Sequence, residues 1–313
     1  MIISASRRTD IPAFYSKWFM ERIRKGYYVK VNPYNSKQKK VVSLLPKDVD
    51  AIVFWTKNPK PLMKEIHTLE NIGYNFYFQF TLNDFPGAFE PTLPSLDSRV
   101  KVFQELSKRI GPKRVIWRYD PIIYSSVTPL SSIVNSFQQL ASKLEGYTER
   151  VVISFVDMYG KTKNKFGKLE KEHGIEFYDL TAEHNQEKLL SLCTTLKDIA
   201  SSSNLEIFTC AEKIDLDSVG IKHGACIDKG LLEEIFGLNL GLKKDTNQRS
   251  ECLCVSSEEM GTYNTCKFNC TYCYAVQSEK SVYNTTKNHN WKSPLLIGEL
   301  NNGEKFSEQL KLF

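Results

Sequence analysis

Three cysteines near the end of the sequence have the spacing that most clearly indicates chemistry. They lie in the segment Cys266-Lys-Phe-Asn-Cys270-Thr-Tyr-Cys273. Three thiolates at this spacing can bind three irons of a cubane 4Fe-4S cluster and leave the fourth iron open to a substrate or cosubstrate. Tetrahedral zinc would need a further ligand, and the nearest histidine in the sequence is His289. We therefore predict a 4Fe-4S cluster here, with zinc as the alternative.

A second set of cysteines remains after these three are assigned. All eight cysteines lie in the second half of the chain, and Cys193 sits in the apolar run LLSLCTTL, where a thiol behaves as a small core residue. The other four are Cys210, Cys226, Cys252 and Cys254. Four thiolates complete a second cubane or a structural zinc site. We predict a second, auxiliary 4Fe-4S cluster, with zinc or unligated thiols as alternatives.

Polar side chains follow several of the predicted strands. The carboxyl ends of parallel strands form the active site of a βα barrel, and they also gather ligands in a doubly wound sheet. The candidate catalytic residues at such ends are Arg7, Asp10, Arg118, Asp120 and Glu212. Arg118 is a candidate for a ribose or a carboxylate because its guanidinium presents a fork of donors, and a salt bridge to Asp120 is the alternative.

The elements that must position these residues are short apolar strands with helices between them. Near-continuous apolar runs, which are typical of parallel sheets, occur at residues 2–6, 51–59, 75–84, 114–123, 150–157 and 205–212. Helices are predicted at 61–72, 98–110 and 186–201, and a hairpin at 27–44. The pattern predicts an α/β fold, a partial TIM-like βα barrel over residues 1–245. Residues 246–313 are predicted to form a cysteine-rich iron-sulfur segment and tail packed on the barrel mouth.

Composition and charge narrow the class of protein. The 313 residues carry 42 Lys and Arg against 36 Asp and Glu, a net charge of +6, which is ordinary for a folded protein. No apolar run approaches the roughly 18 residues of a membrane span, and no signal peptide begins the chain, so we predict a cytoplasmic protein without membrane contact. The lysine-rich runs at 37–40 and 161–171 are predicted to be solvated loops. GxSxG, Walker and GxGxxG motifs are absent, which argues against the hydrolase, P-loop and dinucleotide-binding classes.

The cysteine motif and its surroundings resemble a known group of enzymes. The CxxxCxYC spacing followed by Tyr274-Ala275 resembles the cluster motif of radical S-adenosylmethionine (SAM) enzymes, in the version of the spore photoproduct lyase branch. The segments FWTKN, FTLN and the run from EPTLPSLDSRV to YDPII resemble that branch in the same order. Over nearly its full length the chain resembles the family DUF1848, a domain of unknown function. The matching segments are ISASRRTDIP, FWTKNP, WRYDP, CAE, CID and the CxC before CxxxCxYCYA.

The resemblance implies SAM as a cofactor and a radical SAM barrel. Lys57 would neutralise the methionine carboxylate, Thr81 would hydrogen-bond nearby, and Tyr272 would pack near the adenine. One-electron reduction of SAM would give a 5′-deoxyadenosyl radical. Because this motif lies near the C-terminus rather than after the first strand, the C-terminal segment would deliver the cluster to the barrel mouth. The lyase branch, like this chain, lacks the Gly-Gly-Glu motif.

The predicted function is therefore that of a radical SAM enzyme with an unidentified substrate. A nucleobase or nucleic acid is the first expectation, and a peptide or metabolite is comparable. Ferredoxin or flavodoxin is the expected kind of electron donor. Two alternatives stay open: an iron-sulfur electron-transfer or sensing protein without SAM chemistry, and a zinc-stabilised nucleic-acid-binding module.

Overall fold

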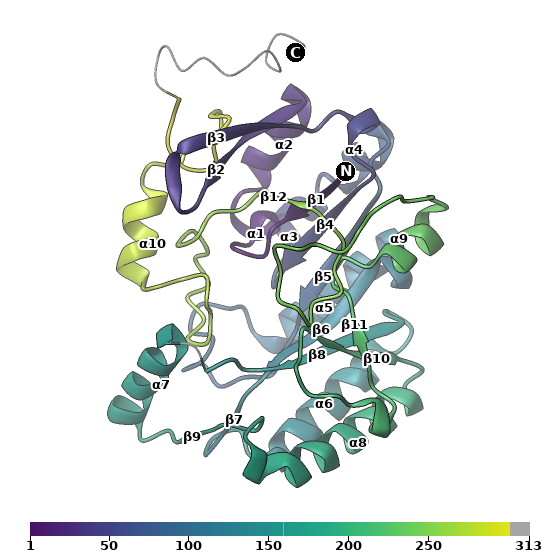
Figure 1. Cartoon of the computed structure of the whole chain (residues 1–313), viewed down its shortest axis with the longest axis vertical. Coiled ribbons are helices and arrows are strands. Elements are labelled where there is room, and N and C mark those ends of the chain that lie inside the picture. Colours follow the sequence, from purple (N-terminus) through teal and green to yellow (C-terminus); the bar gives the residue numbers. More distant parts are fainter. Residues whose placement is uncertain (159, 301–313) are drawn as a thin grey trace. The chain divides into compact units, whose positions relative to one another are not determined.

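The structure is a computed structural model that describes residues 1–158 and 160–300 (Figure 1). The part of the predicted C-terminal tail beyond residue 300 lies outside the described residues. The chain forms two compact units that interleave along the sequence. The first comprises Met1–Tyr77, Ser256–Lys267 and the chain from Ala275 onward, and the second comprises Phe78–Val255 and Phe268–Tyr274. These boundaries differ from the division at residue 245 that the sequence predicted.

The main sheet of the described chain has eight strands. In sheet order they are β11 (Lys222–Gly224), β10 (Glu206–Cys210), β8 (Arg150–Phe155), β6 (Val115–Ile122), β5 (Phe76–Thr81), β4 (Ala51–Thr56), β1 (Ile2–Ala5) and β12 (Glu258–Glu259). The neighbouring strands for which a register is defined pair in parallel. The predicted α/β class and parallel sheet are confirmed, and the barrel stays a prediction.

Among the described residues, the first unit carries β1, β4 and β12 together with a hairpin and five helices. These further elements are β2 (Tyr27–Asn32), β3 (Asn35–Ser43), α1 (Ile11–Phe14), α2 (Ser16–Lys25), α3 (Lys60–Met63), α4 (Ile66–Ile72) and α10 (Glu279–Thr286). The hairpin is antiparallel, as predicted, whereas the helix predicted at 61–72 is divided into α3 and α4. The Phe54 ring of β4 meets Phe19 and Phe76 edge to face, with ring centroids 5.3 and 6.0 Å away, and these contacts anchor α2 on the sheet.

The second unit carries the other main-sheet strands, except for the first residues of β5, and the longer helices. Its further elements are α5 (Leu96–Ile110), α6 (Leu130–Leu144), α7 (Gly160–His173), α8 (Gln186–Ser202), α9 (Lys229–Phe236) and the antiparallel pair β7 (Tyr124–Ser125) and β9 (Phe177–Tyr178). The 3-10 turns of the two units are Pro46–Asp48, Pro112–Arg114, Glu183–Asn185 and Asp217–Val219. The Trp117 ring of β6 stacks on Phe137 of α6 at 4.9 Å, and its Nε1 donates to the Leu82 carbonyl at 2.9 Å. This buried contact fixes α6 against the strand that carries Arg118.

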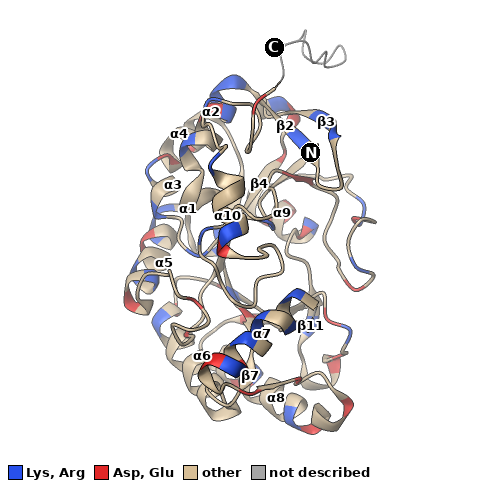
Figure 2. Ribbon diagram, turned by 90° about the vertical axis from the view of Figure 1, so that its left-hand side faces the viewer, with Lys and Arg blue, Asp and Glu red and all other residues tan. Residues whose placement is uncertain are grey.

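The lysine-rich segment at 161–171 is not a loop, so that prediction was wrong. It forms most of α7, which buries Thr162, Phe166 and Leu169 on one face. The spacing of these three residues is helical, and the lysines between them dominated the composition on which the loop prediction depended. In Figure 2 the Lys and Arg positions are coloured blue along the ribbon of α7. The other lysine run, residues 37–40, lies within strand β3 and is likewise not a loop.

The helices of the described residues include none with the length and apolar character needed to cross a lipid bilayer.

Gly261 supplies a test of the packing in the first unit. A Cβ at this position would lie 1.8 Å from Ser6 Oγ and 3.1 Å from Glu259 Oε1. We expect Gly261→Ala to lower the free energy of unfolding by roughly 1–3 kcal/mol, because the backbone must move to relieve the overlap. The matched control is Gly167→Ala in the interior of α7, where a Cβ meets nothing within 4 Å. The control should be neutral or stabilising in a thermal melt, and equal melting temperatures for the two variants would contradict this account.

Candidate functional site

The second cysteine set comes together in the second unit. Cys210 ends β10 and pairs in register with Gly224, and Cys226 follows β11 two residues later, so the two thiols meet with their sulfurs 2.7 Å apart. Cys254 lies beside them, and its Sγ accepts a hydrogen bond from the Ile227 backbone N–H at 3.3 Å. Cys252 in turn is hydrogen-bonded to Cys254. The four cysteines that the sequence grouped are therefore neighbours in space.

The pKa values of Cys210 and Cys226 are shifted in opposite directions. The hydrogen bond from Cys226 lowers the pKa of Cys210 to about 7, with help from the Arg118 charge and against the cost of burial. The same hydrogen bond raises the pKa of Cys226 well above its usual value, together with a hydrogen bond to Cys254 and burial. Cys210 is therefore the member of the pair that more readily becomes a thiolate.

Arg118 is buried beside this pair and uses its donors within the protein. Its Nη1 donates to Cys226 Sγ at 2.8 Å, and its Nε donates to Asp120 Oδ2 at 2.8 Å. Burial by itself would lower the pKa of Arg118, but Asp120 and the sulfurs of Cys226 and Cys210 hold that pKa above its ordinary value. The salt bridge to Asp120, which the sequence left as one of two alternatives, is present.

Two carboxyl groups complete this cluster. Asp120 accepts a hydrogen bond from Ser154 Oγ in addition to those of Arg118. Glu212 accepts from the Phe155 backbone N–H at 2.9 Å, and burial raises the pKa of Glu212 to about 8, with smaller contributions from nearby acidic groups that include Asp120 and Cys210. At neutral pH Glu212 is therefore mostly protonated and can donate a hydrogen bond.

The segment that carries Cys270 and Cys273 is attached to the loop around Phe89. The Thr271 backbone N–H donates to the Phe89 carbonyl at 3.0 Å, and the Tyr272 hydroxyl donates to Glu90 Oε1. Burial, together with the Glu90 charge, raises the pKa of Tyr272 well above its usual value. Tyr272 is thus a neutral donor that anchors the motif, and its predicted contact with adenine stays a prediction.

Lys165 is a residue of this site that the sequence reasoning missed. Its Nζ donates to the Cys273 carbonyl at 3.1 Å, and it is half-buried on α7. Burial lowers the pKa of Lys165, and the Cys273 and Cys270 thiols oppose that effect. The helical spacing of Phe166 and Leu169 could have revealed α7, which carries Lys165 to the motif.

The remaining predicted residues belong mainly to the first unit. Asp10 accepts from Thr56 Oγ1 at 2.9 Å and from the Lys57 backbone N–H at 2.7 Å. The Arg7 guanidinium lies over the Trp55 ring, 5.3 Å from its centroid. Cys266 is near the buried Tyr15, whose hydroxyl donates to the Thr265 carbonyl at 2.6 Å.

Thr81 lies in the second unit, at the end of β5. It pairs in register with Arg118 on β6, so it borders the cluster around the second cysteine set. The predicted residues thus form two groups. Arg7, Asp10, Lys57 and Cys266 belong to the first unit, and Thr81, Arg118, Asp120, Glu212, Tyr272 and the other six predicted cysteine ligands belong to the second.

The described residues contain no group of three or more His, Cys, Asp or Glu side chains already arranged to hold a metal ion. The amine of Lys165 lies close enough to Cys270 and Cys273 for its charge to interact with both side chains.

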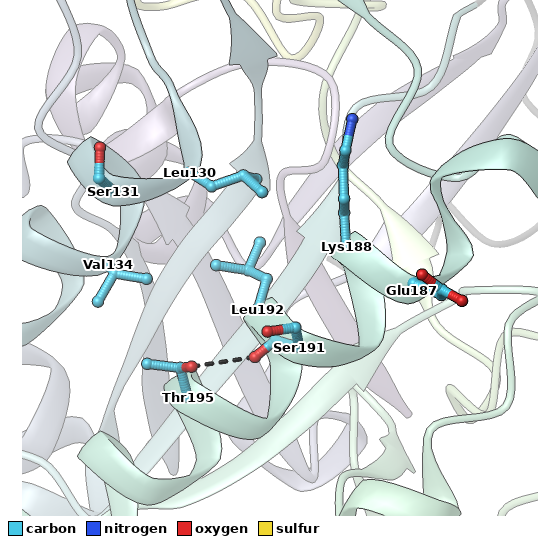
Figure 3. A pocket seen from close by; sticks show the side chains of 8 residues that line it. All are labelled: Leu130, Ser131, Val134, Glu187, Lys188, Ser191, Leu192 and Thr195. Atoms are coloured by element: carbon cyan, nitrogen blue, oxygen red, sulfur yellow. Dashed lines mark hydrogen bonds between the residues drawn. The ribbon is translucent and has the colours of Figure 1, made fainter.

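A pocket of about 360 Å³ lies between α6 and α8 in the second unit (Figure 3). Leu130 and Leu192 extend toward each other in it, and the Thr195 hydroxyl is bonded to the Ser191 carbonyl at 3.0 Å. Its lining residues are Leu130, Ser131, Val134, Glu187, Lys188, Ser191, Leu192 and Thr195. None of them is a predicted site residue, so we place the candidate site at the cysteines instead.

The fold and the site define a mixed α/β protein with a large parallel sheet and a cysteine-rich C-terminal region. The family model described as Domain of unknown function (DUF1848) matches residues 2–275, and the chain belongs to this family. A comparison with curated proteins finds no match.

Asp10, in the first unit, should make the stability of the protein depend on pH. Burial raises the pKa of Asp10 from 3.8 to about 7, against hydrogen bonds from the Lys57 and Ala13 N–H groups and from Thr56. The folded protein thus binds this proton more tightly than the unfolded chain. The stability that Asp10 contributes is present below about pH 4 and is lost as the pH rises through 7, at up to about 1.4 kcal/mol per pH unit.

We expect Asp10→Asn to flatten that slope in urea unfolding measured from pH 4 to pH 8. Identical slopes for the wild-type protein and the variant would show that Asp10 does not titrate in this range.

Proposed function

We propose that this protein is a radical-SAM-type iron-sulfur enzyme built on a partial βα barrel. Its 4Fe-4S cluster would be held by Cys266, Cys270 and Cys273. The spacing of these three cysteines carries the proposal, because three thiolates leave one iron of a cubane open for chemistry. The parallel sheet, whose strand ends carry polar residues, is the kind of scaffold on which such a site is built.

The surroundings of the motif suit this cofactor. Cys270 is buried and Cys273 is half-buried, so the protein shields the position of the cluster from much of the solvent. The ammonium of Lys165 near both thiols would offset part of the negative charge of a thiolate-bound cluster. When bound, the cluster and SAM supply the one-electron cleavage that gives a 5′-deoxyadenosyl radical.

The chain's own residues would bind SAM and hold the cysteine motif in place. Lys57 would pair with the methionine carboxylate of SAM, and Thr81 would donate a hydrogen bond to SAM, as the resemblance implies. Tyr272 and Glu90 keep the motif segment in place through their hydrogen bond, so the cysteines are held before the cofactor arrives. Arg118 has its donors occupied by Asp120 and Cys226, and its proposed role is to organise the second cysteine set rather than to bind SAM.

The substrate and the redox partner stay predictions from the resemblance. A nucleobase or nucleic acid, or else a peptide or metabolite, is the proposed substrate class, and ferredoxin or flavodoxin the kind of electron donor. A protein that uses an iron-sulfur cluster for electron transfer or sensing is the second candidate, since it needs the same cysteines without SAM chemistry.

The decisive experiment uses the full chain reconstituted with iron and sulfide without oxygen. We expect Cys270→Ala to lose about four irons per chain, and to form no 5′-deoxyadenosine with dithionite and SAM. Cys193→Ala is the matched control, because Cys193 is fully buried in the core of α8 and should leave the iron content unchanged. Unchanged iron in Cys270→Ala would contradict the cluster assignment. Iron without 5′-deoxyadenosine in the reduced wild-type protein would favour the electron-transfer candidate.

Lys57→Ala tests the SAM site separately. We expect intact iron content and at least tenfold weaker SAM binding in equilibrium dialysis, because one charge-assisted contact to a carboxylate is worth about 1.5–3 kcal/mol. Lys60→Ala, an exposed lysine three residues away, is the control and should bind SAM like the wild-type protein. Equal SAM affinity for the two variants would remove Lys57 from the site.

A further inference from the structure

The distance between Cys210 and Cys226 does not suit the auxiliary cluster. In a cubane each thiolate binds a different iron, and even on a single zinc two thiolates stand about 3.8 Å apart when each bond is about 2.3 Å. The two sulfurs lie 2.7 Å apart, which leaves no room for a metal between them. The auxiliary cluster would require these two sulfurs to separate by about 1.1 Å, and no step of the proposed function passes through it.

We propose that Cys210 and Cys226 form a redox-active dithiol that closes reversibly to a disulfide. A disulfide has an S–S bond of about 2.05 Å, so the sulfurs need to approach by only about 0.7 Å. The strands β10 and β11 are parallel neighbours. Cys210 is the last residue of β10 and pairs with Gly224, the last residue of β11, and Cys226 lies two residues further on. The sheet therefore holds Cys210 and Cys226 close enough for their sulfur atoms to form a bond.

The two cysteines differ in access, which assigns their roles. Cys210 is half-buried, whereas Cys226 is 2% exposed. Cys210 would therefore attack an incoming small-molecule disulfide such as oxidised glutathione, forming a mixed disulfide and releasing one glutathione thiolate. Cys226 would then attack the Cys210 sulfur, closing the internal disulfide and releasing the second glutathione. The two protein thiols lose two protons and two electrons, and the glutathione disulfide is reduced to two thiols.

Neighbouring side chains hold Cys226 in position for the second step. Gln79 Nε2 donates to the Cys226 backbone carbonyl at 2.8 Å, and Arg118 Nη1 donates to Cys226 Sγ at 2.8 Å. The guanidinium would stabilise negative charge on that sulfur as it attacks. Asp120 fixes Arg118 in turn, so Arg118 is a positioning residue for the dithiol.

The test uses the full-length protein, purified without oxygen and incubated with glutathione buffers of increasing oxidation. We expect peptide mapping to show a Cys210–Cys226 disulfide that dithiothreitol reverses. Cys226→Ser should stop at the mixed disulfide on Cys210, whereas the matched control Cys252→Ser should still form the internal bond. Arg118→Gln should slow closure severalfold, and Arg118→Lys should restore part of the rate.

Several outcomes would overturn the proposal. A disulfide from Cys226 to Cys254 instead of Cys210 would refute the pairing. If Cys210 and Cys226 resist both oxidant and alkylation until a chelator is added, the two thiols are metal ligands and not a redox pair. Cys270→Ala separates this test from that of the proposed function, because it removes a motif ligand and should leave the Cys210–Cys226 disulfide unaffected.

Discussion

The buried guanidinium of Arg118 is the constraint on which the polar centre of the second unit depends. An arginine that is 5% exposed must find partners inside the protein, since an unpaired buried charge is strongly destabilising. It finds them in Asp120 of its own strand and in Cys226, which follows a strand at the edge of the sheet. One side chain in the middle of the sheet thereby ties the position of an edge cysteine to β6.

The two cysteine groups have different physical surroundings, and this difference separates their chemistry. Cys270 and Cys273 lie in a segment held by backbone and tyrosine hydrogen bonds, with the Lys165 amine nearby. Cys210 and Cys226 touch each other. The first arrangement places a lysine amine near the motif thiols, which suits a cluster, and the second brings two thiols into contact, which suits thiol–disulfide exchange.

Much of the fold could be predicted because local patterns encode it. Continuous apolar runs marked β1, β4, β5, β6, β8 and β10, and the hairpin followed from two β-branched runs around a turn. The helix α7 was missed because lysines outnumber its buried residues, although Phe166 and Leu169 have helical spacing. The short strands β11 and β12 have too few residues for a periodicity of their own, and only their neighbours in the sheet define them.

The cysteine spacing of the motif, the apolar runs of the main strands and the family could be read from the sequence alone, whereas Arg118, expected at a strand end, lies within β6. The contacts of Arg118 with Asp120 and Cys226 depend on the three-dimensional fold, and so does the contact between Cys210 and Cys226, which are 16 residues apart in the chain. The reason is physical. Spacing along the chain constrains only residues within one element or turn, whereas contacts between separate strands follow from sheet order and register, which many sequence patterns leave open.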